Sequence, residues 1–234
     1  MLSFVIPTYN EEKGIGPLLD ALNGQITDGD EIIVVDSYSR DRTVDIAQSK
    51  GARVVLQQKM GIGAAKTEGA RGAANRLVVM LDADCVPCAD FVSRIKGRFR
   101  ERPDLVAICG LDLYSSESAF WRTVYNIYSI KVFWLGKAFH YLSGKYWLAA
   151  NNSVIRKDLF FSVGGYRSVV CEDNDLMVRL PRNRNVVYDA KMVATLSDRR
   201  FREGGFLRTV LMWIVADARA WLGAGKDASR YRKA

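Results

Sequence analysis

The strongest constraint on this sequence is the repeated pairing of a short apolar run with an amphipathic segment. Ile32–Val35 and Leu77–Leu81 are unbroken apolar runs. Strands that are covered on both faces have this pattern, because neither face meets water. Further β-rich runs are Leu2–Ile6, Arg53–Leu56 and Leu105–Cys109, and helical patterns near 14–23, 41–50, 62–74 and 89–101 separate the five. The alternation predicts an α/β fold with a mainly parallel sheet flanked by helices.

The composition is that of a globular protein, with 49% hydrophobic and 26% charged residues in 234. We interpret the N-terminal run as a strand and not as a signal peptide, and no stretch approaches the ~18 apolar residues of a membrane span. The four cysteines are therefore expected to be reduced, in a cytoplasmic setting. Cys85 and Cys88 could form half of a zinc site, but a second close cysteine pair is missing.

The net charge of +8 is concentrated in two segments. Residues 199–234 have a net charge of +6 and residues 119–148 a net charge of +4, so the remainder is at −2. This distribution favours a polyanionic partner, with phosphates, a membrane surface and nucleic acid as candidates. Residues 119–148 also contain ten of the 25 aromatic residues. These suit a sugar-stacking or headgroup-level surface, or alternatively a helical layer packed on the sheet.

Polar residues follow the predicted strands at the points where the strands end. In parallel sheets ligands bind beyond the carboxyl ends of the strands, so these residues predict a site. In chain order they are Pro7, Tyr9 and Glu11, then Asp36, then Gly61, Gly63 and Lys66, then Asp82 and Asp84.

Asp82-Ala83-Asp84 places two carboxylates within reach of one cation. Carboxylate oxygens suit Mg²⁺ or Mn²⁺, which also bind substrate phosphates. The alternative is a turn after the strand with a helix N-cap. Gly61-Ile62-Gly63 with Lys66 matches neither the phosphate loop nor the dinucleotide fingerprint. The glycines permit a close approach of the backbone, and a plain loop-to-helix turn is the alternative.

Two charged groups occur near the C-terminus. Glu172-Asp173 opens a predicted helix, where acidic residues are favoured by the helix dipole. A carboxylate there could also deprotonate an acceptor hydroxyl. Arg199 and Arg200, with Arg202, fit the oxygens of a diphosphate or form a solvated basic face.

Taken together, these motifs resemble the GT-A fold of glycosyltransferase family 2. The matching strings are Phe4 to Glu11, Val34 to Ser37, Gly61 to Gly69, Leu81 to Asp84, Asn151 to Arg156, Gly164 to Tyr166 and Glu172 to Leu176. The resemblance covers residues 2–205 and is closest to membrane-associated cellulose-synthase-like members and dolichyl-phosphate mannosyl synthases. Ser197 to Phe201 stands where the former have Gln-x-x-Arg-Trp. The differences disfavour a processive enzyme.

The resemblance implies a role for each matched residue. The residues that would bind the nucleotide-sugar are Pro7, Tyr9, Glu11, Asp36, Lys66, Asp82, Asp84 and Arg200. Asp84 and Asp82 would hold Mg²⁺ or Mn²⁺. Asp173, beside Glu172, would be the catalytic base. Asn151, Asn152 and Trp147 would lie near the donor sugar or the acceptor.

The expected organisation is a GT-A catalytic domain over residues 1–204, with a nucleotide-binding half (1–110) and an acceptor half (111–204). Residues 205–234 are expected to form an amphipathic interface helix and a basic tail. The helix would lie on the cytoplasmic face of the cell membrane.

The expected activity is inverting transfer of a sugar, with mannose from GDP-mannose as the first choice, to a hydroxyl of a lipid-linked or membrane-proximal glycan. Four alternatives stay open. They are a dolichyl-phosphate sugar synthase with a lipid phosphate acceptor, a UDP-sugar-dependent transferase, a sugar nucleotidyltransferase and a basic nucleic-acid-binding module.

Overall fold

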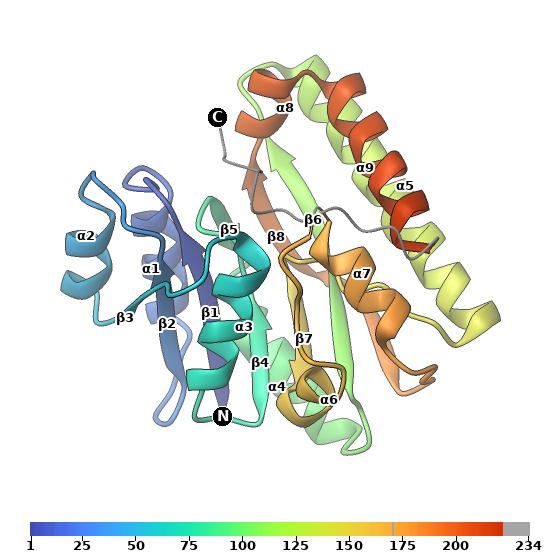
Figure 1. Ribbon diagram of the computed structural model, residues 1–234, viewed down its shortest axis with the longest axis horizontal. Helices are drawn as coiled ribbons and strands as arrows, with labels where there is room; N and C mark the ends of the chain where they lie inside the picture. The colour runs from blue at the N-terminus through green and yellow to red at the C-terminus, as the bar shows by residue number, and fades with distance from the viewer. Residues whose placement is uncertain (170, 222–234) are drawn as a thin grey trace.

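The computed structural model describes residues 1–169 and 171–221, and these contain one eight-stranded sheet in the order β3-β2-β1-β4-β7-β6-β8-β5 (Figure 1). The strands are β1 (Leu2–Thr8), β2 (Glu31–Asp36), β3 (Arg53–Leu56), β4 (Leu77–Met80), β5 (Cys85–Pro87), β6 (Ala107–Ser115), β7 (Ser153–Arg156) and β8 (Val186–Ser197).

The N-terminal part of the sheet is parallel, because β1 pairs with β2 and β4, and β2 pairs with β3, all in parallel. Its strands are covered on both faces. Phe4 and Val34 belong to one hydrophobic cluster, whereas their neighbours Val5 and Val35 belong to the cluster on the other face. This burial of alternate residues on opposite faces is the reason for the unbroken apolar runs, and the predicted α/β class is confirmed.

The remainder of the sheet is mixed. β7 is antiparallel to β4 and β6, β5 is antiparallel to β8, and β6 is parallel to β8. The strand expected at Leu105–Cys109 starts later and continues to Ser115. Its second part escaped notice because it is only half-buried and alternates apolar with polar residues.

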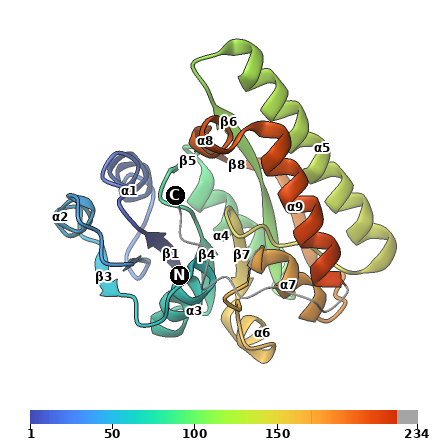
Figure 2. The same cartoon turned by 45° about the horizontal axis from the view of Figure 1, so that its top comes forward.

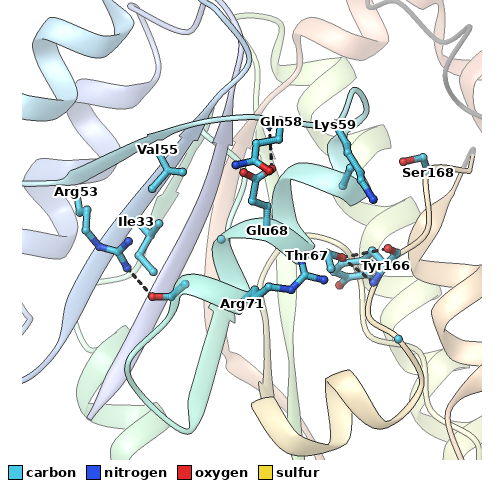
Figure 3. A pocket seen from close by; sticks show the side chains of 14 residues that line it. Ile33, Arg53, Val55, Gln58, Lys59, Thr67, Glu68, Arg71, Tyr166 and Ser168 are labelled. Carbon is cyan, nitrogen blue, oxygen red and sulfur yellow. Dashed lines mark hydrogen bonds between the residues drawn. The ribbon is translucent and has the colours of Figure 1, made fainter.

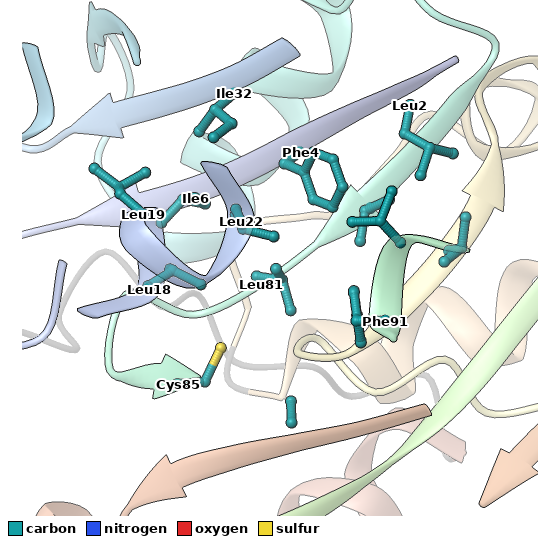
Figure 4. Close-up of a cluster of buried hydrophobic side chains, with 14 of the residues drawn as sticks. Leu2, Phe4, Ile6, Leu18, Leu19, Leu22, Ile32, Leu81, Cys85 and Phe91 are labelled. Atoms are coloured by element: carbon teal, nitrogen blue, oxygen red, sulfur yellow. The ribbon is translucent and has the colours of Figure 1, made fainter. Parts of the chain in front are cut away.

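Helices cover both faces of the sheet. The first face is covered by α1 (Ile15–Asn23), α2 (Thr43–Ser49) and α4 (Phe91–Glu101), whose apolar residues join Leu2, Phe4 and Ile6 in one cluster (Figure 4). The second face is covered by α3 (Ile62–Gly72), α5 (Ala119–Ser143), α6 (Lys157–Ser162) and α7 (Glu172–Arg179). The result is a three-layer arrangement of helices, sheet and helices.

The helices α5 and α9 (Phe206–Trp221) lie side by side, joined to the sheet through α8 (Arg199–Gly204) (Figure 2). The ring of Tyr128 on α5 lies 5.6 Å from that of Phe206 and 6.4 Å from that of Trp213. The helix expected after residue 204 is therefore present, whereas the expected basic tail at 222–234 lies outside the described residues. Within the described ranges, no helix combines the length and apolar character needed to cross a bilayer.

The helix α3 packs closely on β1 and β2 at Gly69. A Cβ atom there would lie 2.5 Å from Val5 Cγ1 and 2.8 Å from Val35 Cγ2, both of which are fixed in the sheet. Gly97, in the middle of α4, has no atom within 4 Å of the same position. The two helical glycines therefore differ only in whether there is space for a side chain.

We predict that Gly69→Ala lowers the free energy of unfolding by about 1–3 kcal/mol, because overpacking outweighs the gain in helix propensity. The matched change Gly97→Ala should raise it by up to about 1 kcal/mol, because only the propensity changes. Urea denaturation measures both. Equal effects of the two substitutions would contradict the close packing of α3 on the sheet.

Candidate active site

The carboxyl ends of β1, β2 and β4 meet at one edge of the sheet, as the parallel pairing requires. Most of the residues that the sequence predicted for the site follow these ends. Pro7, Asp36 and Glu11 are buried, Tyr9 is 42% exposed, and the side chains of Asp82 and Asp84 are 21% and 25% exposed. This edge of the sheet therefore presents two partly accessible carboxylates above residues that are buried.

The ammonium group of Lys66 is fully buried at this edge. It donates hydrogen bonds to Asp82 Oδ1 at 2.9 Å and to the carbonyl of Ala150 at 2.6 Å, and it lies 3.9 Å from Glu172 Oε1. Its residue is 0% exposed. Lys66 thus connects α3 to the residues after β4, to the segment before β7 and to the start of α7.

The charges of this cluster shift each other's pKa values. Burial lowers the pKa of Lys66, but Asp82 and Glu172 outweigh it, so the net pKa is raised and the ammonium stays charged. Burial raises the pKa of Glu172 to about 7, against the opposing effect of Lys66. At neutral pH Glu172 is therefore poised between its neutral and charged forms.

Arg199 links the residues that follow β1 to those that follow β4. Its guanidinium lies 2.6 Å from Glu11 Oε1 and 3.5 Å from Asp84 Oδ2. Arg200, the arginine to which the resemblance assigns a role, is exposed. Desolvation lowers the pKa of Arg200, but the charges of Asp82 and Asp84 outweigh this effect, so the net pKa is raised. The sequence suggested that Arg199 could bind a diphosphate, but it gave no sign of the contact with Glu11, because a partner 188 residues away leaves no local signal.

Asp36 has its carboxylate engaged within the protein. Oδ1 accepts hydrogen bonds from Thr8 Oγ1 at 2.9 Å and Ser39 Oγ at 2.6 Å, and Oδ2 accepts one from the Ser39 amide at 2.8 Å. The carboxylate thus ties the loop after β2 to the end of β1.

Asp173 accepts a hydrogen bond from the indole Nε1 of Trp147 at 3.2 Å. The two residues come from different segments, and both are partly exposed. The structure therefore gives Trp147 a contact that the sequence did not suggest, since the indole N–H orients the predicted base.

Asn151 and Asn152 are both buried, and Asn151 contacts Asp82. Asn151 Oδ1 accepts a hydrogen bond from the Asp82 amide at 2.7 Å, and its Nδ2 donates to Asp112 Oδ1 at 3.0 Å. Asn152 Nδ2 donates to the carbonyl of Met192. Burial raises the pKa of Asp112 to about 7, and Asn152 and Asn151 oppose the shift by hydrogen bonding. Asp112 was not predicted as a site residue, although an acid between Leu111 and Leu113 in a strand is a usable signal.

The two glycines before Lys66 serve packing within the protein. Gly61 precedes α3 with a φ of 109°, and a Cβ on Gly63 would lie 2.4 Å from the carbonyl oxygen of Arg167 and 3.2 Å from Glu172 Cβ. The loop-to-helix turn that was the alternative interpretation is present, and it brings α3 against the loop leading to α7.

The two accessible carboxylates fit a divalent cation that is shared with a diphosphate. Among the described residues, no group of three or more His, Cys, Asp or Glu side chains could hold a metal ion. Mg²⁺-type sites with phosphate substrates need only one or two protein carboxylates, and the phosphates and water supply the other ligands. Asp82 and Asp84 meet that requirement. The cysteines are free thiols, and His140 contacts the Lys145 carbonyl and the Tyr188 ring.

A cavity of about 540 Å³ lies on the other side of α3 (Figure 3). Thr67, Glu68 and Arg71 line it together with Tyr166. None of the predicted site residues lines this cavity, so it is separate from the carboxylate edge.

The family is shown by comparison with known proteins. The sequence model of glycosyl transferase family 2 matches residues 3–168, which is well over half of the chain. The chain belongs to glycosyl transferase family 2.

Two curated relatives are similar over part of the chain. A dolichyl-phosphate hexose transferase of Haloferax volcanii is 35% identical over 106 residues, which is 45% of this chain and 46% of that protein. An undecaprenyl-phosphate 4-deoxy-4-formamido-L-arabinose transferase of Pseudomonas aeruginosa is 32% identical over 116 residues, which is 45% of this chain and 34% of that protein. The chain thus matches between a third and a half of the length of these relatives.

Solved structures confirm the GT-A fold. Glucosyl-3-phosphoglycerate synthase from Mycobacterium tuberculosis, crystallised with Mn²⁺, UDP-glucose and phosphoglyceric acid, has a TM-score of 0.66 and 19% identity, covering 96% of this chain and 79% of that one. S. aureus TarS 1-349 in complex with UDP-GlcNAc has a TM-score of 0.63 and 16% identity, covering 84% of this chain and 58% of that one.

We predict that Lys66→Met lowers the free energy of unfolding by about 3–5 kcal/mol, because Asp82 and Glu172 lose a buried cation. The control is Lys50→Met, which removes the more exposed ion pair with Asp20 and should cost about 0–1 kcal/mol. Urea denaturation at pH 8 compares the two. Equal costs would show that Lys66 does not hold the site together.

We also predict a pH effect of Glu172. Its pKa is raised from 4.5 in the unfolded chain to about 7 in the native state, so folding takes up a proton between these values. Its contribution to stability is full below pH 4.5 and is lost as the pH rises to 7. Glu172→Gln removes this dependence. As the pH rises from 4.5 to 7, the free energy of unfolding of the variant relative to that of the native protein should therefore increase by up to about 1.4 kcal/mol per pH unit. Parallel stability–pH curves from pH 5 to 8 would refute the assignment.

Proposed function

We propose that this protein is a metal-dependent, inverting glycosyltransferase. It moves a sugar from a nucleoside diphosphate sugar to a lipid-linked acceptor at a membrane face. The observation that carries the proposal is the pair Asp82 and Asp84, held at the carboxyl edge of a parallel sheet by Lys66 and Arg199. Catalysis would take place in the GT-A domain at 1–204, with the nucleotide bound by 1–110 and the acceptor by 111–204.

The donor diphosphate fits this edge in charge. Arg199 and Arg200 follow β8 next to the two carboxylates, and both retain raised pKa values. Guanidinium groups bind diphosphate oxygens in a bidentate manner and stabilise the negative charge that develops as the sugar leaves. Asp82 and Asp84 would hold Mg²⁺ or Mn²⁺, which neutralises the diphosphate when bound. Solved structures with Mn²⁺ and a UDP-sugar support this assignment by likeness of fold.

The nucleoside is assigned to the ends of β1 and β2. Pro7 and Asp36 are buried under this region, and Tyr9 is exposed beside them. In this proposal Lys66 supports the nucleotide site from inside the protein, because its buried ammonium is already bonded to Asp82 and to the Ala150 carbonyl. The likeness to structures with UDP-sugars makes UDP a stronger candidate than the GDP suggested by the sequence.

Asp173 is assigned as the base. Its carboxylate, oriented by Trp147, would take the proton of an acceptor hydroxyl as that oxygen forms a bond to the anomeric carbon and the bond to the diphosphate breaks. Attack opposite to the leaving group inverts the anomeric carbon. Asn151 and Asn152 would shape the floor of this region from their buried positions.

A lipid phosphate is the second candidate acceptor. It is favoured by the two curated relatives whose names include dolichyl-phosphate and undecaprenyl-phosphate. A phosphate monoester is already ionised near neutral pH, since its second pKa is about 6, and needs no base. The two acceptors therefore differ in their dependence on Asp173.

We predict that Asp173→Asn reduces sugar transfer to a hydroxyl acceptor by about 10²–10⁴-fold while leaving nucleotide binding unchanged. The control is Asp158→Asn, an exposed carboxylate on α6 that follows the end of β7, where Arg156 pairs with Leu77 at the opposite edge of the sheet. Purified protein would be assayed with radiolabelled nucleotide-sugars and with either a lipid-linked sugar or a polyprenyl phosphate. Full activity of Asp173→Asn toward the phosphate would assign the second acceptor, and full activity toward the hydroxyl would overturn the proposed base.

The exposed side of α5 is the proposed membrane contact. Phe120, Ile127, Trp134 and Tyr141 recur every seven residues and form a stripe whose members are 49–77% exposed. Leu135 and Leu142 lie beside them at 70% and 82%. α9 adds exposed Leu207 and Leu211. Residues 119–148 have four basic and no acidic residues. An apolar stripe with basic flanks fits an anionic bilayer surface, where each cation contributes about 1 kcal/mol.

We predict that the protein co-sediments with vesicles containing phosphatidylglycerol and much less with pure phosphatidylcholine. Leu135→Glu should weaken this binding about tenfold, because the apolar burial is lost. Leu56→Glu, at a comparably exposed leucine on β3, is the control and should bind as the native protein does. Binding that ignores both lipid charge and Leu135→Glu would refute this contact.

A further inference from the structure

Asp112 on β6 is a carboxylate next to the site to which the proposed reaction gives no task. It is linked to Asp82 through one side chain. Asn151 donates from Nδ2 to Asp112 Oδ1 at 3.0 Å and accepts at Oδ1 from the Asp82 amide at 2.7 Å. Asn151 is 5% exposed, so both ends of its amide are bonded inside the protein.

The orientation of an asparagine amide is set by its partners. A carboxylate only accepts hydrogen bonds and a backbone N–H only donates. A flipped Asn151 would place its NH₂ against the Asp82 N–H and its oxygen against the Asp112 carboxylate, and both contacts would be repulsive. Asp112 therefore selects the orientation in which Asn151 holds the Asp82 main chain.

Asp112 itself is held rigidly. Ser129 on α5 donates to its carbonyl, and Asn126 bonds both the amide and the carbonyl of Tyr114 two residues on. An irregularity in the β6–β8 pairing lies between Gly110 and Leu111. Bulges of this kind redirect the side chains that follow them.

The segment that Asp112 fixes has further contacts with the site. The Ala150 carbonyl accepts a hydrogen bond from Lys66, and Asn152 adopts a left-handed φ of 53° while bonding the Met192 carbonyl. A Cβ on Gly110 would lie 2.2 Å from Asn152 Oδ1, so β6 approaches this segment closely. A change in the amide of Asn151 would therefore move the partners of both Asp82 and Lys66.

We infer that Asp112 is a positioning residue of the donor site, which acts through the Asn151 amide to hold Asp82 where the metal–diphosphate complex binds. This inference rests on the proposed function. Asp112 touches neither substrate nor metal in this account, and its effect is on the geometry of Asp82.

The test exchanges the two groups. Asn151→Asp alone places a second carboxylate against Asp112, and we expect it to weaken Mn²⁺-dependent binding of the preferred nucleoside diphosphate about tenfold, the scale of a hydrogen bond to a charged group. In the double variant Asp112→Asn/Asn151→Asp, the amide at 112 can donate to the carboxylate at 151, whose other oxygen accepts from Asp82. Binding should return to within about threefold of the native value.

Calorimetry with UDP and GDP, with and without Mn²⁺ at pH 8, gives the affinities, and urea denaturation gives the stability of each variant. Asp158→Asn, an exposed carboxylate on α6, is the control. A merely structural role would change stability without changing the ratio of affinities with and without Mn²⁺. If Asn151→Asp does not fold, binding by the folded double variant supports the inference.

The inference is overturned if Asn151→Asp binds like the native protein, or if the double variant fails to fold or binds no better than a folded Asn151→Asp. Failure of the native protein to bind either nucleotide would instead overturn the proposed function.

Discussion

The buried ammonium of Lys66 is the interaction on which the arrangement of the site depends. A charge in a protein interior is tolerated only when opposite charges and hydrogen bonds compensate its desolvation. Lys66 finds this compensation in Asp82, Glu172 and the Ala150 carbonyl, which come from three separate segments. These segments cannot separate without leaving the ammonium uncompensated. The Lys66 side chain thereby fixes the relative positions of Asp82, of Glu172 at the start of α7 and of the segment that leads from Ala150 into β7.

The same edge concentrates unusual backbone conformations. The non-glycine residues with positive φ among the described residues are Asn10, Tyr38, Asn152 and Cys171. They follow β1 and β2, precede β7 and cap α7. Such conformations cost free energy and persist where the surroundings enforce them, often at functional sites. Hydrogen bonds hold Asn10 in this conformation: its amide donates to Ser39 Oγ, and its Oδ1 accepts from the Arg40 amide.

The sequence predicted those features that depend on local pattern. Unbroken apolar runs such as Leu77–Leu81 identified the buried strands, and the acids that follow them marked the edge where Asp82 and Asp84 lie. Features that depend on pairing between distant segments could not be predicted. The antiparallel insertion of β7 between β4 and β6 is of this kind, as is the contact of Arg199 with Glu11. The burial of Lys66 was hidden for the same reason, because its compensating carboxylates lie 16 and 106 residues away.

The central claim is that Asp82 and Asp84 form a site for a nucleoside diphosphate together with a divalent cation. The most direct measurement is calorimetric titration of UDP and of GDP into the native protein and into Asp84→Asn, each with and without Mn²⁺. The account predicts that one nucleotide binds to the native protein only when Mn²⁺ is present, and that Asp84→Asn weakens this binding. Binding that is indifferent to Mn²⁺ and to Asp84→Asn, or no binding of either nucleotide, would contradict it.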